Sequence, residues 1–205
     1  MRKLTILIVL TFVVSLLHGT DVAGEVSGTW SSEYSPYRVT GNIIVPASGA
    51  LVISHGVHVV FQGNFQITVQ GRIEVNGTKN DSVRIYGVEG VVWESIRLET
   101  GNRHNVFEHC VITNAKTGIN NTSSSMDLKN SRLGYMEDTA VNIFGSSTSP
   151  FVVITSTKIH DTDASGITIT DYLNVQIYDS VFTRCSRVAM RGAIHISQQT
   201  SLSSS

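Results

Sequence analysis

The sequence is poor in charged residues, proline and cysteine. Charged side chains make up 15% of its 205 residues, well below the roughly 25% of an average globular chain, and there are only 3 prolines. The 15 Lys and Arg side chains nearly balance the 16 Asp and Glu side chains. This balance provides no electrostatic argument for a nucleic acid, an anionic membrane or a polyanionic substrate. We therefore expect no nucleic-acid partner.

Strong catalytic and metal-binding motifs are also missing. The sequence has no nucleophile elbow, and its glycine-rich spots are not followed by the Lys-Ser/Thr of a phosphate-binding loop. Several histidines are scattered over different positions of the repeat described below, which argues against a histidine metal site: His104, His109, His160 and His195. We expect no metal and no cofactor.

Only one long apolar run is present. It covers residues 4–17, follows Arg2 and Lys3, and precedes the small residues Gly19, Ala23 and Gly24. Such a run is shorter than the roughly 20 residues that span a bilayer. The pattern predicts an export signal peptide over residues 1–24 and a mature chain without a transmembrane segment, with an uncleaved membrane anchor as the alternative.

Short alternating apolar segments dominate the rest of the chain. Between residues 42 and 87, apolar pairs such as Ile43 with Val45 and Leu51 with Ile53 alternate with polar residues and are separated by glycines. This is the period-two pattern of strands that bury one face. Taken alone, it fits a sandwich, a barrel or a β-helix.

A repeat in the second half separates these folds. Residues 107–112, 128–133, 154–159 and 177–182 each begin and end with a large apolar residue. Each is followed by a small residue that opens a further strand, at Gly118, Ala140, Gly166 and Ala189. A fixed pattern with gaps of variable length is typical of stacked coils. We therefore predict an all-β parallel β-helix.

Stacking also predicts which side chains form columns inside the coils. The residues that close the four segments should form one interior ladder: Ile112, Leu133, Ile159 and Phe182. The residues that open them should form another: Phe107, Leu128, Ile154 and Ile177.

The same register bears on the two cysteines, Cys110 and Cys185. Three coils separate them, or roughly 14 Å along the axis at an inter-strand spacing of about 4.8 Å. A disulfide needs Cα atoms within about 7 Å of each other. We predict that both are unpaired and that Cys110 is the nearer to the core.

The order of these strands resembles a known group. Residues 40–46, 49–53, 56–63, 71–78, 81–85 and 93–96 are similar to the opening coils of secreted bacterial right-handed parallel β-helix repeat proteins, which have the pectin-lyase-like fold. Residues 109–119 resemble their repeat, and the resemblance covers about residues 26–197. It implies a right-handed helix and a secreted or cell-surface location in a bacterium. It implies little about function, because the group mixes lyases, hydrolases and adhesins.

The resulting plan has four parts: a leader at 1–24, an N-terminal cap at 25–41, coils at 42–197, and a Ser-rich tail or truncation point at 198–205. The cap holds Trp30, Tyr34 and Tyr37, which either cover the first coil or form an aromatic platform for a sugar.

Our leading hypothesis is a non-enzymatic extracellular protein that binds carbohydrate or another surface through an exposed polar sheet. The runner-up is a polysaccharide lyase or glycosidase acting on a uronate-containing polymer, with four candidate catalytic residues: Asp161, Asp163, Asp179 and Arg184. The sequence lacks the adjacent aspartates, Gly-His and Arg-x-Lys of pectin hydrolases. A third hypothesis is a fragment of a larger adhesin.

The four candidates also have a purely structural interpretation. Asp161 and Arg184 align on adjacent coils, as do Lys116, Glu137 and Asp163, so these residues could form charge pairs between coils. Calcium enters only under the enzymatic hypothesis, since it needs six or more oxygen ligands and Asp161 with Asp163 supplies too few.

Overall fold

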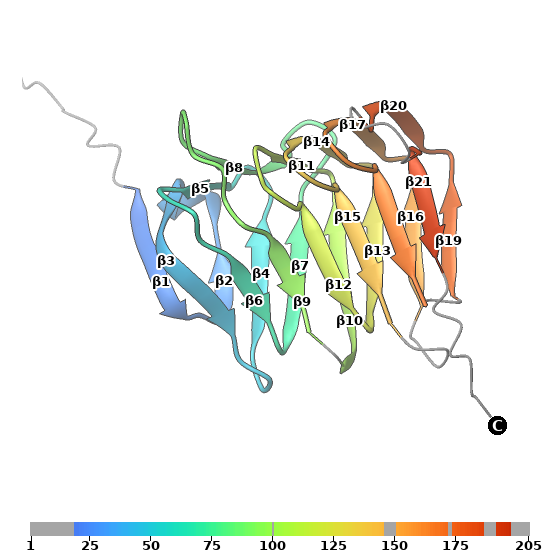
Figure 1. The fold of residues 1–205 in the computed structure, drawn as a ribbon. Coiled ribbons are helices and arrows are strands. Elements are labelled where there is room, and N and C mark those ends of the chain that lie inside the picture. Colours follow the sequence, from blue (N-terminus) through green and yellow to red (C-terminus); the bar gives the residue numbers. More distant parts are fainter. Residues whose placement is uncertain (1–18, 100, 146–150, 172–173, 187–191, 198–205) are drawn as a thin grey trace, which may run out of the picture.

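The chain winds through short parallel strands that stack into a solenoid of about seven turns (Figure 1). The computed structural model describes residues 19–99, 101–145, 151–171, 174–186 and 192–197. In this part of the chain the only helical segment is the 3-10 turn η1 (Ser32–Tyr34). The predicted all-β parallel solenoid is therefore confirmed, whereas its right-handedness stays a prediction. Residues 1–18 of the predicted leader and the predicted tail at 198–205 lie outside the described residues.

Each coil gives one strand to each of three faces. Face A consists of β2 (Gly28–Trp30), β4 (Ala50–Ser54), β7 (Arg72–Asn76), β10 (Gly101–Glu108), β13 (Ser124–Lys129), β16 (Val152–Thr155) and β19 (Val175–Tyr178).

Face B follows face A along the chain. It consists of β5 (His58–Phe61), β8 (Val83–Gly87), β11 (Cys110–Thr113), β14 (Arg132–Met136), β17 (Lys158–Thr162) and β20 (Val181–Cys185).

Face C completes the coil. It consists of β6 (Ile67–Val69), β9 (Ile96–Leu98), β12 (Ile119–Thr122), β15 (Val141–Phe144), β18 (Ile167–Thr170) and β21 (Ile194–Ser197). The long strand β3 (Tyr37–Val45) joins faces B and C, since its first half pairs with β5 and its second half with β6.

Both predicted interior ladders are confirmed. Along face B, Ile112 pairs with Leu133, Leu133 with Ile159, and Ile159 with Phe182. Along face A, Phe107, Leu128, Ile154 and Ile177 pair in the same order. All of these side chains are fully buried except Ile177 and Phe182 of the last described coil, which are partly buried. The apolar core thus runs along the axis between the three faces.

The strands predicted to open after Gly118, Ala140, Gly166 and Ala189 form a third ladder, along face C, which differs from the prediction at its last member. Ile119, Val141 and Ile167 are continued by Ile194, which follows Ala193, and not by the residue after Ala189. Residues 189 and 190 lie outside the described residues. The segment between Phe182 and this strand is longer than the corresponding segments of the earlier coils. A strand start predicted from the earlier spacing therefore falls too early in the sequence.

Two asparagines interrupt the apolar interior. Asn121 is completely buried, and its amide group clamps Ser124: Nδ2 donates to the Ser124 carbonyl at 2.8 Å, and Oδ1 accepts from the Ser124 N–H at 2.9 Å. Asn105 is 1% exposed and accepts the Ile73 N–H at 3.0 Å. Both amides form hydrogen bonds with backbone groups at the corner between faces C and A, where the chain leaves the regular backbone pairing of the strands.

An additional strand precedes the predicted cap. β1 (Thr20–Glu25) pairs in parallel with β3, from Thr20 beside Tyr37 to Glu25 beside Ile44. Val22 packs against the core. The predicted leader end at residue 24 therefore coincides with the end of an ordered strand, and the position of cleavage stays a prediction. No helix in the described part of the chain is long and apolar enough to cross a membrane.

Candidate functional site

The corner between faces A and B is built from a column of left-handed residues. His109, Asn130, Ser156 and Asp179 occupy equivalent positions on successive coils, and each has a positive φ. The residue after each of the last three carries a hydroxyl group, and two of these hydroxyls accept a backbone N–H from the preceding coil: Ser131 from Cys110 at 3.1 Å and Ser180 from Thr157 at 3.3 Å. The corner is therefore polar and held by side-chain hydrogen bonds.

A hollow of about 510 Å³ lies along this corner and the outer side of face B. It is lined by Lys79, Ser82, His109, Cys110, Val111, Asn130, Ser131, Arg132, Ser156 and Lys158. We call it the face B groove. Three of these side chains, Lys79, Arg132 and Lys158, are cationic, and no carboxylate is found among the described residues that line the groove.

Strand register explains why the cations gather there. Arg132 of β14 and Lys158 of β17 are paired neighbours on adjacent coils, and both side chains point outward from face B. Lys79 comes from the turn between β7 and β8. Because coils stack at about 4.8 Å, equivalent outward residues must lie side by side. A chain with balanced total charge therefore carries a locally positive surface.

The opposite corner, between faces B and C, holds two of the predicted catalytic residues. Its left-handed column consists of Asn114, Tyr135, Asp161 and Arg184. Arg184 donates from Nε to Asp161 Oδ1 at 2.5 Å and from Nη2 to Oδ2 at 2.7 Å. The Asp161 carboxyl is 6% exposed, and the guanidinium of Arg184, helped by His160, holds its pKa well below the usual range.

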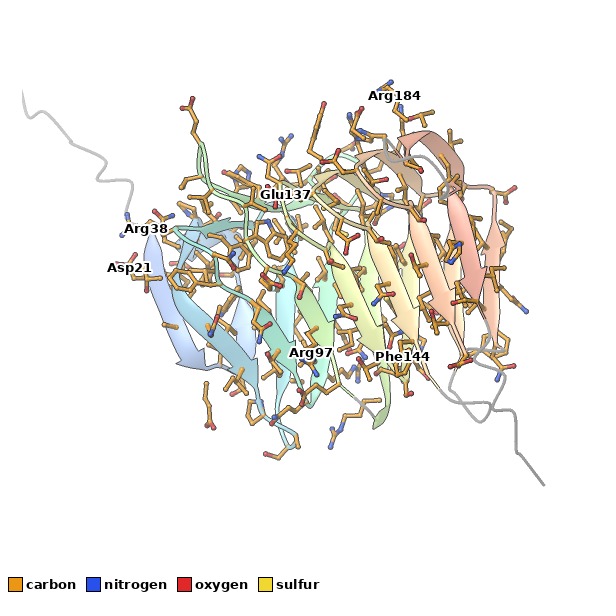
Figure 2. The ribbon with its side chains drawn as sticks, viewed as in Figure 1. Asp21, Arg38, Arg97, Glu137, Phe144 and Arg184 are labelled. Atoms are coloured by element: carbon orange, nitrogen blue, oxygen red, sulfur yellow. The ribbon has the colours of Figure 1, made fainter. Side chains whose placement is uncertain are left out.

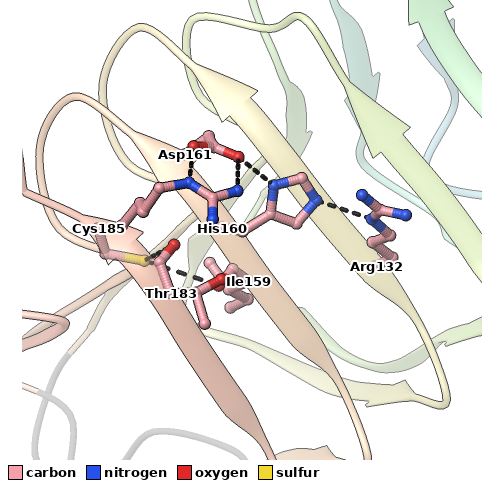
Figure 3. A network of polar contacts seen from close by, with 7 residues as sticks. Arg132, Ile159, His160, Asp161, Thr183 and Cys185 are labelled. Atoms are coloured by element: carbon pink, nitrogen blue, oxygen red, sulfur yellow. Dashed lines mark hydrogen bonds and ion pairs between the residues drawn. The ribbon is translucent and has the colours of Figure 1, made fainter.

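His160 connects this corner to the groove (Figure 3). Its ring is 1% exposed; Nδ1 lies 2.7 Å from Asp161 Oδ2, and Nε2 accepts the Nε–H of Arg132 at 2.7 Å. The ring of Tyr135 meets it edge-on at 5.2 Å between centroids. Arg132, His160, Asp161 and Arg184 therefore form one continuous network across three adjacent coils.

Glycine makes room for this imidazole. Gly134 pairs with His160 on the neighbouring strand, and a Cβ atom at Gly134 would collide with the His160 ring. Every larger residue at this position would push the ring out of the network.

Of the remaining acidic candidates, Asp163 lines the same hollow as Asp161, whereas Asp179 lies elsewhere. Asp179 belongs to the column at the corner between faces A and B, before β20 begins, whereas Arg184 lies near the end of β20. Asp163 is half-buried and, with Glu137, Tyr135 and Asp161, lines a separate hollow of about 160 Å³. The predicted four-residue group is therefore assembled only in part: Asp161, Asp163 and Arg184 lie at one corner, and Asp179 lies at the other.

The other predicted charge column extends further than expected. Backbone hydrogen bonds place Lys116, Glu137 and Asp163 at equivalent positions, as predicted, and add Glu94 from the coil before. Lys116 pairs with Glu94 at 3.0 Å. Figure 2 shows Glu137 and Arg184 near one edge of the solenoid, and Arg97 and Phe144 of face C away from them.

The predicted aromatic platform does not form. Trp30 and Tyr37 stack on each other with centroids 4.6 Å apart, and they are only 6% and 4% exposed. Their ring faces are therefore used within the N-terminal cap. Tyr34 is 55% exposed and is not a member of this stacked pair.

Both cysteines are free thiols. Cys110 is buried, and this burial raises the pKa of its thiol to about 12. Cys185 is half-buried, and its Sγ lies 3.7 Å from the carbonyl oxygens of Ile159 and Thr183. The strands β14 and β17 separate the strands that carry them.

Sequence reasoning missed Lys79, Arg132 and Lys158. Two of them could have been found, since Arg132 and Lys158 immediately precede the ladder residues Leu133 and Ile159. The position of Lys79 depends on a turn whose path the register does not determine.

Comparisons with known proteins add no relative to this picture. No family model, curated protein or solved structure matches the chain. Among the described residues, no group of three or more His, Cys, Asp and Glu side chains could hold a metal ion.

Proposed function

We propose that the protein is a non-enzymatic binding protein that holds an extended acidic polysaccharide in the face B groove. The observation that carries the proposal is the groove itself, in which Lys79, Arg132 and Lys158 gather without a carboxylate among the described lining residues. Cations aligned along the solenoid axis match a polymer with acidic groups at regular intervals. The serine and asparagine side chains beside them can donate and accept hydrogen bonds with sugar hydroxyls.

Rigidity favours such a role. The strands and their left-handed corners fix the backbone under the groove, and hydroxyl ladders hold the corner between faces A and B. A pre-organised surface loses little conformational entropy when a ligand binds. Individually weak ion pairs along the groove can therefore add to useful affinity.

The state of Asp161 favours binding over the lyase or glycosidase hypothesis. Both of its carboxylate oxygens are hydrogen-bonded, and its lowered pKa makes it a poor proton acceptor. Asp179 lies at the other corner of face B, before β20 begins, and not beside Asp161. The proposal also includes export to the cell surface or medium, for which the leader-like sequence at 1–24 is the support.

Binding assays with matched glycans test the proposal. Titration calorimetry would compare polygalacturonate and dextran sulfate with uncharged dextran, at low and high salt. We expect the acidic polymers to bind and salt to weaken them, because exposed ion pairs are screened. Equal binding of the uncharged polymer, or degradation of polygalacturonate during the titration, would overturn the proposal.

Single substitutions locate the binding surface. Lys158→Ala and Lys79→Ala should each weaken binding about two- to fivefold, since an exposed ion pair contributes under about 1 kcal/mol. Arg97→Ala is the matched control, because Arg97 is an exposed cation on face C. Equal losses in all three variants would indicate non-specific attraction and not a groove.

A further inference from the structure

The hydrogen bond between Arg132 and His160 determines the protonation of the imidazole. Arg132 Nε carries a hydrogen and has no acceptor capacity, so His160 Nε2 must present a lone pair across their 2.7 Å separation. The proton of the neutral ring is then on Nδ1 and is donated to Asp161 Oδ2 at 2.7 Å. This arrangement requires a neutral imidazole in one tautomer.

The charged and titratable groups around the ring come from three strands. Strand β14 contributes Arg132 and Tyr135, β17 contributes Asp161 and Lys158 on either side of His160, and β20 contributes Arg184 through its pair with Asp161. The carboxylate of Asp161 lies 2.7 Å from Nδ1 of the ring. One side of the ring therefore faces an anion and the other a cation.

We propose that His160 is a pH-dependent latch for Arg132. The neutral ring holds the guanidinium by the Nε2 hydrogen bond, and the protonated ring releases it into the face B groove, which Arg132 already lines. The step moves one proton from solvent to Nε2 and breaks one hydrogen bond. Histidine is the side chain whose unperturbed pKa lies nearest to neutral pH, which suits it to a protonation-dependent latch.

The two halves of the network respond differently. Protonated Nε2 presents an N–H to the Nε–H of Arg132, so donor meets donor and two positive charges meet at contact distance. The Nδ1–H bond to Asp161 is retained and becomes an ion pair, anchored from the other side by Arg184. The ring therefore stays in place while Arg132 moves. The consequence for ligand affinity rests on the proposed function: acidification makes Arg132 available to an anionic chain.

Nuclear magnetic resonance tests the latch without a ligand. In the full chain labelled with ¹⁵N at histidine and arginine, we expect unprotonated Nε2 on His160 at neutral pH and an Arg132 Nε–H protected from exchange. As His160 titrates, this protection should disappear. An Nε2–H tautomer at neutral pH, or an Arg132 signal that does not follow the titration, would overturn the proposal.

Binding of dextran sulfate at neutral and acidic pH tests the consequence, because sulfate groups stay ionised throughout. Affinity should rise about two- to fivefold on acidification, as expected for one added exposed ion pair. All variants carry His109→Gln, which removes the histidine that lines the groove. The rise should persist in His195→Gln, which replaces an exposed histidine of face C, whereas His160→Gln and Arg132→Gln should abolish it. A full pH response in His160→Gln would refute the latch. Absence of binding at both pH values would refute the proposed function alone, and the resonance experiment would still decide the latch.

Discussion

Asp161 and Arg184 face each other across two successive coils and form a two-point ion pair, with distances of 2.5 Å and 2.7 Å between nitrogen and oxygen atoms. Both residues have a left-handed backbone, with φ values of 52°. The aspartate is nearly buried, whereas 67% of the arginine side chain is exposed. The pair thus covers the edge of face B at its last described coils, and its aspartate holds His160 by the contact with Nδ1.

Replacing Asp161 by Asn should make the free energy of unfolding decline less steeply as the pH falls. Arg184 and His160 hold the pKa of this carboxyl below its ordinary 3.8. A pKa that is lower in the folded than in the unfolded chain adds stability above about pH 4, and this stability is lost as the pH falls through the folded value. Urea denaturation between about pH 2 and pH 5 should therefore show a steeper decline for the wild type than for Asp161→Asn.

Asp21→Asn provides the comparison, because Asp21 forms an ion pair with Arg38 in which both side chains are largely exposed. Its effect on the acid slope should be small, since solvent screens such pairs. Identical slopes for wild type and Asp161→Asn would mean that the Asp161 pair does not contribute to stability.

Leu133→Ala should lower the free energy of unfolding by about 2–5 kcal/mol, because it leaves a cavity in the face B ladder between Ile112 and Ile159. Ile44→Ala is the matched control: Ile44 lies on β3 but is 36% exposed, so its loss should stay within about 0.5 kcal/mol. Chemical denaturation followed by circular dichroism measures both. If Leu133→Ala lowered the free energy of unfolding no more than Ile44→Ala, the stacking of this ladder would be contradicted.

The two thiols should differ in reactivity. Burial raises the pKa of Cys110 to about 12, so iodoacetamide at neutral pH should leave it unmodified in the folded chain. Cys185 is half-buried and should react slowly. Both should react in denaturant without prior reduction, as read by mass spectrometry. An intramolecular disulfide under non-reducing conditions would contradict the register of the coils.

A chain that starts at Thr20 should be more stable than one that starts at Val26. The shorter chain lacks β1, which pairs with β3 and places Val22 against the core. Thermal melts of the two chains would show the difference as a lower Tm for the shorter one. Equal Tm values would mean that β1 adds nothing to the fold. If the protein is exported, the mature N-terminus should lie before β1, since cleavage after Gly24 would remove most of that strand.

Most of the fold was predictable from the family resemblance and from the spacing of the repeat. Alternation and the spacing of apolar residues are local properties, and stacking converts them into columns without further information, as Leu133 and Ile159 illustrate. The alignment of Asp161 with Arg184 followed from the same count. Where coil length varies, counting failed, as it did for the strand that begins at Ile194.

By itself, the sequence determined the parallel solenoid and the residues of its interior, because a coil can bury its apolar side chains only against equivalent residues of its neighbours. The tertiary structure alone decided how the outward residues are used. It stacked Trp30 on Tyr37 inside the cap, separated Asp179 from Asp161, and placed His160 over Gly134 within reach of Arg132. These outcomes depend on side-chain directions at left-handed corners and on contacts between coils, which no spacing along the chain encodes.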